Sequence, residues 1–158
     1  MKRLLLITCL CTLSMCAAAH TAPTATEGNA GRADSVIAGQ PFKGTFYCAE
    51  TRVSIILDLY EQSIKIPGYD FFGQTNGYMR GNTNADLYGI WMLTDFKIKG
   101  KTALLRFSND MGSDSQTIEF TEQSDGTFRY KTTGGNEIRK AVKRKLVKIS
   151  DTMVFKRK

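Results

Sequence analysis

The residue types that carry most enzyme chemistry are scarce in this chain. Its single histidine, His20, lies near the N-terminus outside any patterned segment, so histidine general-base catalysis and a histidine-rich metal site have little to draw on. The sequence contains no glycine-rich phosphate loop, no nucleophile elbow and no cysteine and histidine spacing typical of zinc. Asp70 and Asp86 could act as the carboxylate pair of a glycosidase only if the fold placed them about 5 to 10 Å apart. We therefore expect no catalytic residues, no cofactor and no metal, and rank a carboxylate hydrolase last.

Aromatic side chains form the pattern that is most typical of a binding surface. Eight of the sixteen aromatic residues lie between residues 60 and 96, interspersed with glycine and asparagine. Pro67 and Gly68 break the preceding strand, and two adjacent phenylalanines cannot both face inward from one strand, so we expect residues 66–73 to form a loop. Exposed aromatics of this kind recognise sugars, apolar ligands or protein partners. The candidate binding residues are Tyr69, Phe71, Phe72, Tyr78 and Trp91.

A structural role for the same residues is an open alternative. The loop could fold over the end of a barrel as a hydrophobic plug, with Tyr88 and Trp91 in the core. Both roles stay open for Tyr69, Phe71 and Phe72, whereas we expect a core position for Trp91. The oxygen-rich segment 109–115 lacks the spacing of a calcium loop, and we expect it to be a turn.

Positive charge gathers at the C-terminal end of the chain. Residues 139–158 contain nine of the 22 lysines and arginines, against the single acid Asp151. Such a patch suits an anionic partner, for example phosphate-bearing lipid, a polyanionic glycan or an acidic protein surface. The interpretation that we favour is that these cations mark the solvent face and the protected edge of terminal strands. The candidate basic patch comprises Arg139, Lys140, Lys143, Arg144 and Lys145.

Residues 1–19 have the composition of a secretory signal peptide. Met1, Lys2 and Arg3 give a positive start, residues 4–15 form an apolar run, and the small residues 17–19 fit cleavage after Ala19. The apolar run is shorter than the roughly 20 residues that a membrane-spanning helix needs. We therefore expect export to the periplasm or the medium, which disfavours nucleic acid as a partner.

Lipidation is an alternative fate for the leader. Residues 13–16, Leu-Ser-Met-Cys, resemble a bacterial lipoprotein box, in which Cys16 would become the lipidated first residue and tether the protein to the outer envelope. The other leader cysteines are Cys9 and Cys11, so Cys48 is alone in the body of the protein and no intramolecular disulfide can form there. We expect Cys48 to be a small buried side chain.

The remainder divides into a flexible spacer, residues 20–40, and a β domain, residues 41–158. Threonine, alanine, glycine and asparagine dominate the spacer. In the domain, short runs rich in β-branched and aromatic residues alternate apolar with polar positions. This alternation is typical of antiparallel strands with one buried and one solvent-exposed face. Residues 98–101 and 124–126 fit tight hairpin turns, and Glu61 and Gln62 fit a two-residue link between neighbouring strands. The expected strands cover residues 44–48, 53–60, 63–66, 77–80, 88–98, 102–107, 116–121, 127–132, 145–149 and 152–155.

These strands predict an all-β fold, a single antiparallel meander closed into a small barrel or bent into a curved β-sandwich. Residues 138–142 fit a helix as well as a strand. The motif Gly89-Ile90-Trp91 resembles the Gly-x-Trp element of lipocalins, which in that family stands on the first strand, whereas here it is central. A lipocalin- or calycin-like barrel is therefore an analogy of fold, and we assign no family.

From these observations we expect an exported binding protein of the cell envelope rather than an enzyme. It would hold a small apolar or glycan ligand at an aromatic-lined mouth. The alternative is an extracytoplasmic interaction factor, such as an inhibitor or immunity-like protein, that uses the aromatic loop and the basic C-terminal edge. A cavity inside the barrel would favour the first function, whereas a filled interior with Tyr69, Phe71 and Phe72 pointing outward would favour the second. We expect contact with a membrane only through lipidation at Cys16.

Overall fold

The computed structural model describes residues 39–158. The predicted signal peptide, the candidate lipidation site Cys16 and nearly all of the predicted spacer lie outside the described residues. No helix among the described residues is long and apolar enough to cross a membrane.

The described residues form an all-β fold built on a closed, antiparallel, eight-stranded barrel. Each barrel strand pairs with the next one along the chain once two short inserted hairpins are set aside, and the last strand, β12, pairs with the first, β1. The expectation of a closed meander is therefore confirmed, and the curved sandwich is not what forms. The barrel strands are β1 (Lys43–Cys48), β2 (Val53–Asp58), β5 (Gly77–Gly81), β6 (Ile90–Lys99), β7 (Thr102–Asn109), β8 (Ser115–Glu122), β9 (Phe128–Gly135) and β12 (Thr152–Arg157).

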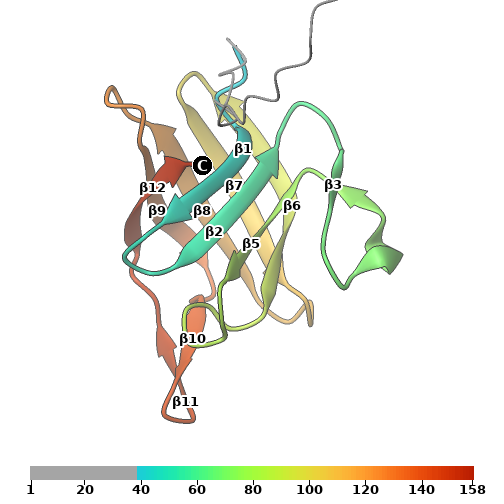
Figure 1. Ribbon diagram of the computed structural model, residues 1–158, viewed down its shortest axis with the longest axis vertical. Helices are drawn as coiled ribbons and strands as arrows, with labels where there is room; N and C mark the ends of the chain where they lie inside the picture. Colours follow the sequence, from blue (N-terminus) through green and yellow to red (C-terminus); the bar gives the residue numbers. More distant parts are fainter. Residues whose placement is uncertain (1–38) are drawn as a thin grey trace, which may run out of the picture. The chain divides into compact units, whose positions relative to one another are not determined.

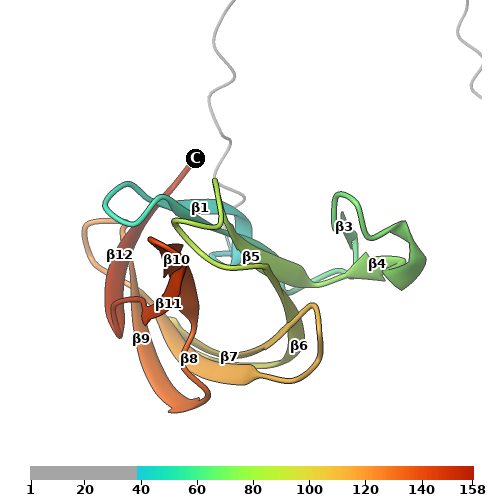
Figure 2. The ribbon, with the colours of Figure 1, turned by 90° about the horizontal axis from the view of Figure 1, so that it is seen from below.

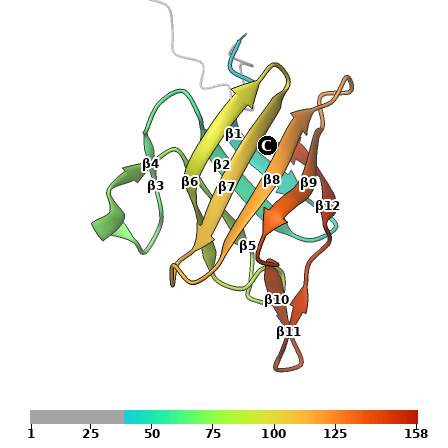
Figure 3. The same cartoon turned by 180° about the vertical axis from the view of Figure 1, so that it is seen from behind.

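Two hairpins interrupt the meander and stand outside the barrel (Figures 1 and 3). The first, between β2 and β5, contains β3 (Ile64–Lys65), a single 3₁₀ turn η1 (Asp70–Phe72) and β4 (Gln74–Thr75). The second, between β9 and β12, contains β10 (Arg139–Val142) and β11 (Lys145–Lys148). Residues 138–142, which fit either a helix or a strand by sequence, thus contribute the strand β10.

Apolar residues at alternate positions fill the inside of the barrel. On β8, Ile118 and Phe120 are buried while Thr117, Glu119 and Thr121 are partly exposed, as the period of two along a strand requires. Phe120 lies at the centre of an aromatic group, with ring centroids 5.2 Å from Phe46, 5.2 Å from Phe128 and 5.7 Å from Phe155. Side chains from four neighbouring strands, β8, β9, β12 and β1, therefore meet inside the barrel. Cys48 belongs to this core and is a free thiol, as predicted.

The turn chemistry that the sequence indicates is confirmed at two sites and wrong at a third. Gly100 and Gly126 both have positive φ in the hairpins that join β6 to β7 and β8 to β9. Glu61 and Gln62, however, do not join two paired strands, because β3 pairs with β4 and β2 pairs with β5. The chain leaves the barrel after β2 instead, and it rejoins the barrel at β5.

Candidate functional site

The aromatic residues of the β3–β4 insertion form a cluster on the outside of the barrel. The Tyr69 and Phe72 rings are stacked with centroids 5.9 Å apart, and the Phe71 and Phe72 centroids are 4.3 Å apart. Phe71 is 78% exposed and Phe72 is 44% exposed, although large apolar side chains are normally buried. We call Tyr69, Phe71 and Phe72 the aromatic cluster. The prediction of a loop at residues 66–73 agrees with the single 3₁₀ turn found there.

A carboxylate holds the root of this insertion. Asp58, at the end of β2, is buried and accepts hydrogen bonds from the backbone N–H groups of Tyr60 and Glu61 and from the Ser63 hydroxyl. Its charged partner is Lys43, whose Nζ lies 2.8 Å from Asp58 Oδ2. Burial would raise the pKa of Asp58, but these donors outweigh burial and hold its pKa below the ordinary 3.8. The insertion thus leaves the barrel in a fixed direction.

A second hydrogen bond ties the far side of the insertion to the opposite end of the barrel. The Tyr69 hydroxyl donates to Asp110 Oδ2 at 2.6 Å, across 41 residues of sequence. This bond, together with burial, raises the pKa of Tyr69 above its ordinary 10.0. The insertion is therefore held at its root by Asp58 and again at Tyr69, the first residue of the aromatic cluster, which limits the conformational freedom of the segment that carries the rings.

The structure separates Tyr78 and Trp91 from the aromatic cluster. Both side chains are buried. Tyr78 pairs with Ile56 and Met92 on the outer face of the sheet, while the next residue on β5, Met79, points inward with Trp91. Neither Tyr78 nor Trp91 is thus available to a macromolecular partner in the way that Phe71 is. The expected core position of Trp91 is confirmed.

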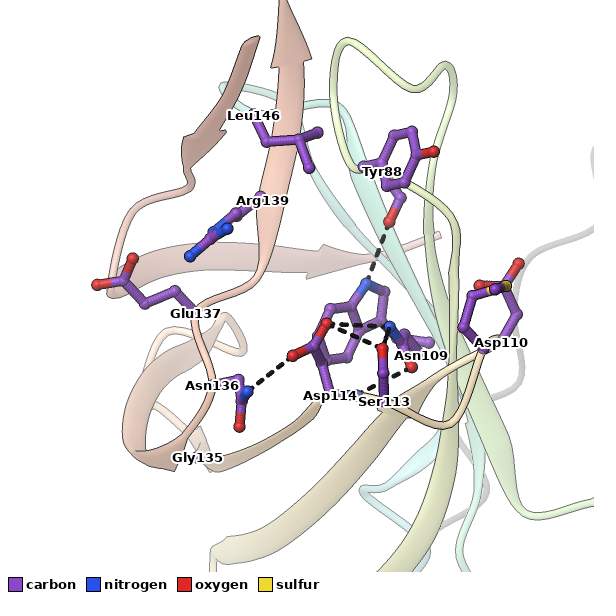
Figure 4. Close-up of a pocket in the computed structure, with 12 residues that line it drawn as sticks. Tyr88, Asn109, Asp110, Ser113, Asp114, Gly135, Asn136, Glu137, Arg139 and Leu146 are labelled. Carbon is purple, nitrogen blue, oxygen red and sulfur yellow. Dashed lines mark hydrogen bonds between the residues drawn. The ribbon is translucent and has the colours of Figure 1, made fainter.

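Trp91 nevertheless lines a pocket of about 430 Å³ at the mouth of the barrel (Figure 4). Its indole Nε1 donates to the Tyr88 carbonyl at 3.2 Å, and Tyr88 itself is half exposed at the rim. On the facing wall, the Asp114 carboxylate accepts hydrogen bonds from Asn109 and Asn136. We call this the mouth pocket; its remaining lining residues include Asp110, Met111, Ser113, Glu137, Arg139 and Leu146.

A neighbouring pocket of about 440 Å³ continues this surface towards the aromatic cluster. The two pockets share Tyr88, Asp110 and Met111, and the second pocket is also lined by Tyr69. One continuous surface therefore runs from the aromatic cluster, across Asp110, into the mouth pocket. The sequence gives no sign of this arrangement, because Asp110 is predicted only as a turn residue and Tyr88 only as a candidate core residue. Segment 109–115 does form the expected turn, closed by the Asn109 N–H donating to the Asp114 carbonyl at 3.1 Å.

The predicted basic patch lies on the β10–β11 hairpin. Lys143 and Arg144 form its two-residue tip, and both have positive φ, 46° and 64°. Among residues 39–158, the only lysine of the hairpin in an ion pair is Lys148, which contacts Glu137 and Asp151. The five cations of the predicted patch are therefore on one element and carry charge that no acidic side chain of the described residues neutralises.

The structure gives the carboxylates of the hydrolase hypothesis other roles. Asp86 is buried and ion-paired with Arg52 at 2.6 Å, and it also accepts hydrogen bonds from Thr83. Burial would raise the pKa of Asp86, but these partners hold its pKa below 3.8. Asp70 lies in the exposed 3₁₀ turn. Within residues 39–158, no group of three or more histidine, cysteine, aspartate or glutamate side chains is arranged to hold a metal ion.

Comparison with known proteins does not assign the chain to a family. No protein-family model matches it, and neither a curated protein nor a solved structure is significantly similar to it.

Proposed function

We propose that this chain is an exported, non-catalytic interaction factor of the cell envelope, and that its aromatic cluster docks a protein partner. The observation that carries the proposal is that aromatic side chains lie on the outside of the barrel as well as in its core. Phe46, Phe120 and Phe128 occupy the interior of the barrel, while the Phe71 and Phe72 rings are exposed on its outside, in contact with the half-buried Tyr69. Rigid, exposed aromatic side chains are the commonest anchors of protein interfaces.

Preorganisation supports this function. Asp58 holds the start of the insertion and Asp110 holds the Tyr69 hydroxyl in its middle, so less conformational entropy is lost when a partner covers the aromatic cluster. The adjoining polar pockets offer hydrogen-bonding groups around an apolar centre, which is the usual anatomy of an interface. Periplasmic or secreted location, with lipidation at Cys16 as the alternative, remains part of the proposal.

The test is removal of the two exposed rings. Phe71→Ser with Phe72→Ser should reduce recovery of the partner from an envelope extract at least 30-fold, since interface anchors each contribute about 2 kcal/mol. Thermal stability should stay nearly unchanged, because these rings lie outside the core. Recovery is measured by quantitative mass spectrometry after affinity capture.

The matched control removes exposed apolar side chains elsewhere. Leu104 and Val154 are exposed on β7 and β12, so Leu104→Ser with Val154→Ser should leave recovery of the partner unchanged. Equal recovery with the cluster variant would reject the proposal. A large fall in melting temperature of the cluster variant would show that the rings are structural.

The mouth pocket favours a second function, binding of a glycan. Its combination of Tyr88 and Trp91 with asparagine and carboxylate side chains suits the apolar faces and the hydroxyl groups of a sugar. A lipocalin-like mode, with an apolar ligand inside the barrel, is less well supported because buried aliphatic and aromatic side chains pack together there as one core. Since Trp91 is the only tryptophan, saccharide binding in this pocket should shift the intrinsic fluorescence of the protein. An unchanged emission spectrum across an oligosaccharide panel would count against a glycan ligand.

A further inference from the structure

The net charge of the described domain is confined to the β10–β11 hairpin. Residues 39–158 contain 19 lysines and arginines against 13 aspartates and glutamates. Six of these cations and none of the acids fall within residues 139–148, so the remainder balances at 13 against 13. The barrel is therefore electrically neutral, and one ten-residue element would be drawn towards an anionic surface.

The hairpin is mounted firmly and projects from the barrel. Its base is fixed by the buried Ile138 and Ile149, whose backbones are hydrogen-bonded at 3.0 Å. Two backbone bonds of 2.8 Å, from Tyr88 N–H to the Arg139 carbonyl and from Ala141 N–H to the Asn84 carbonyl, join it to the loop between β5 and β6. It projects from the end of the barrel at which β12 begins, and the C-terminus, where β12 finishes, lies towards the opposite end (Figures 1 and 2).

The tip of the hairpin places two cations where the backbone favours other residues. A two-residue turn with positive φ at both positions is normally occupied by Asn-Gly or Asp-Gly, yet here the residues are Lys143 and Arg144. The turn therefore holds these two charges at the point farthest along the hairpin, against the ordinary conformational preference of both residues.

Aliphatic side chains share a face of the hairpin with further cations. In the register, Val142 lies opposite Lys145 and Val147 lies opposite Lys140, and directly opposed residues of an antiparallel pair point to the same side. Val142 is 40% exposed and Val147 is 45% exposed. An acidic protein or a soluble polyanion needs only the charges. A phospholipid surface uses both, since headgroups attract cations and the acyl boundary accepts aliphatic groups.

We propose that the β10–β11 hairpin docks this domain onto an anionic phospholipid bilayer, with Lys143 and Arg144 among the headgroups and Val142 and Val147 at the acyl boundary. This contact is independent of the aromatic cluster and of its partner. It also needs no lipid anchor. Docking through the hairpin would leave the aromatic cluster, on a different insertion, exposed to a second molecule.

The test measures cosedimentation with vesicles of phosphatidylcholine, with and without about one third phosphatidylglycerol. Every protein in the experiment is the full chain with Cys16→Ser, which removes the candidate acyl acceptor. Lys143→Asn with Arg144→Gly installs the preferred turn residues, so this variant should fold at least as well as the parent. Its affinity for the anionic vesicles should fall about 25-fold, because each basic residue near an anionic leaflet contributes roughly five-fold.

Two further variants separate a bilayer from other polyanions. Lys97→Gln with Lys99→Gln removes the same charge from β6 and should change vesicle affinity less than about two-fold. Val142→Ser with Val147→Ser keeps every charge and should weaken vesicle binding about ten-fold without affecting binding to heparin, a soluble polyanion. The proposal is overturned if the parent does not prefer anionic vesicles. It is equally overturned if the valine variant binds vesicles as the parent does, which would indicate an acidic macromolecule.

Discussion

Phe120→Ala should lower the free energy of unfolding by about 4 kcal/mol. The Phe120 side chain is fully buried, and its ring meets Phe46, Phe128 and Phe155 from three other strands. Truncation removes the transfer free energy of the ring and leaves a cavity that the rigid barrel wall cannot close. For a domain whose total stability lies in the usual range of roughly 5 to 15 kcal/mol, this loss is a large fraction. Urea denaturation followed by circular dichroism measures it.

Phe71→Ala is the matched control, since the same atoms are removed from an exposed position. The free energy of unfolding should then change by less than about 1 kcal/mol. The difference between the two changes in the free energy of unfolding therefore measures the contribution of burying the ring. A similar loss for both would mean that the aromatic cluster is part of the core, and the proposed interaction surface would then be lost with it.

Gly135→Ala should destabilise the protein by about 4 kcal/mol, because it strains the backbone rather than because it removes core packing. Gly135 has φ of 94°, which side chains other than glycine rarely adopt. An added Cβ would also collide with the Ser115 carbonyl and would lie 2.9 Å from Gln116 Cα. Strain and overlap each cost roughly 1 to 3 kcal/mol. Because Gly135 lines the mouth pocket, the substitution should also disturb the pocket wall.

The neighbouring glycine gives the control for this substitution. A Cβ on Gly134 would meet no atom within 4 Å, and its φ lies outside the positive range. Gly134→Ala should therefore leave the denaturation midpoint nearly unchanged, while Gly135→Ala lowers it. Equal midpoints for the two variants would contradict the described path of β9 at this point.

The barrel was predictable from sequence because its strands obey a local rule. In β8 and β9, apolar and polar residues alternate within a few positions, and Gly126 marks the turn that joins them, so pattern and turn chemistry agree. Residues 138–142 do not follow this rule, because their apolar spacing fits the period of a helix as well as that of a strand. Backbone bonding to the loop between β5 and β6 and pairing with β11 select the strand, and neither partner is visible locally.

The candidate site depends on contacts that no local pattern encodes. The Tyr69 hydroxyl meets Asp110 only because the insertion runs along the outside of the barrel to its far end. The sequence predicts Tyr78 as part of the aromatic surface. Its position on β5, beside the inward-facing Met79, instead places it on a buried part of the outer face of the barrel. Aromatic density thus predicted where a surface would form, but register and insertion geometry decided which rings are exposed.

The closure of β12 against β1 also sets an order of events for folding. β1 is the first barrel strand in the chain and β12 the last; they pair at Phe46 with Arg157 and at Tyr47 with Lys156, and the Lys158 N–H donates to the Thr45 carbonyl at 2.8 Å. Until β12 arrives, β1 and β9 present unpaired edges, which are templates for association with other chains. The barrel therefore cannot close until β12 has been synthesised. It gains its protection against edge-to-edge association only when β12 pairs with both β1 and β9.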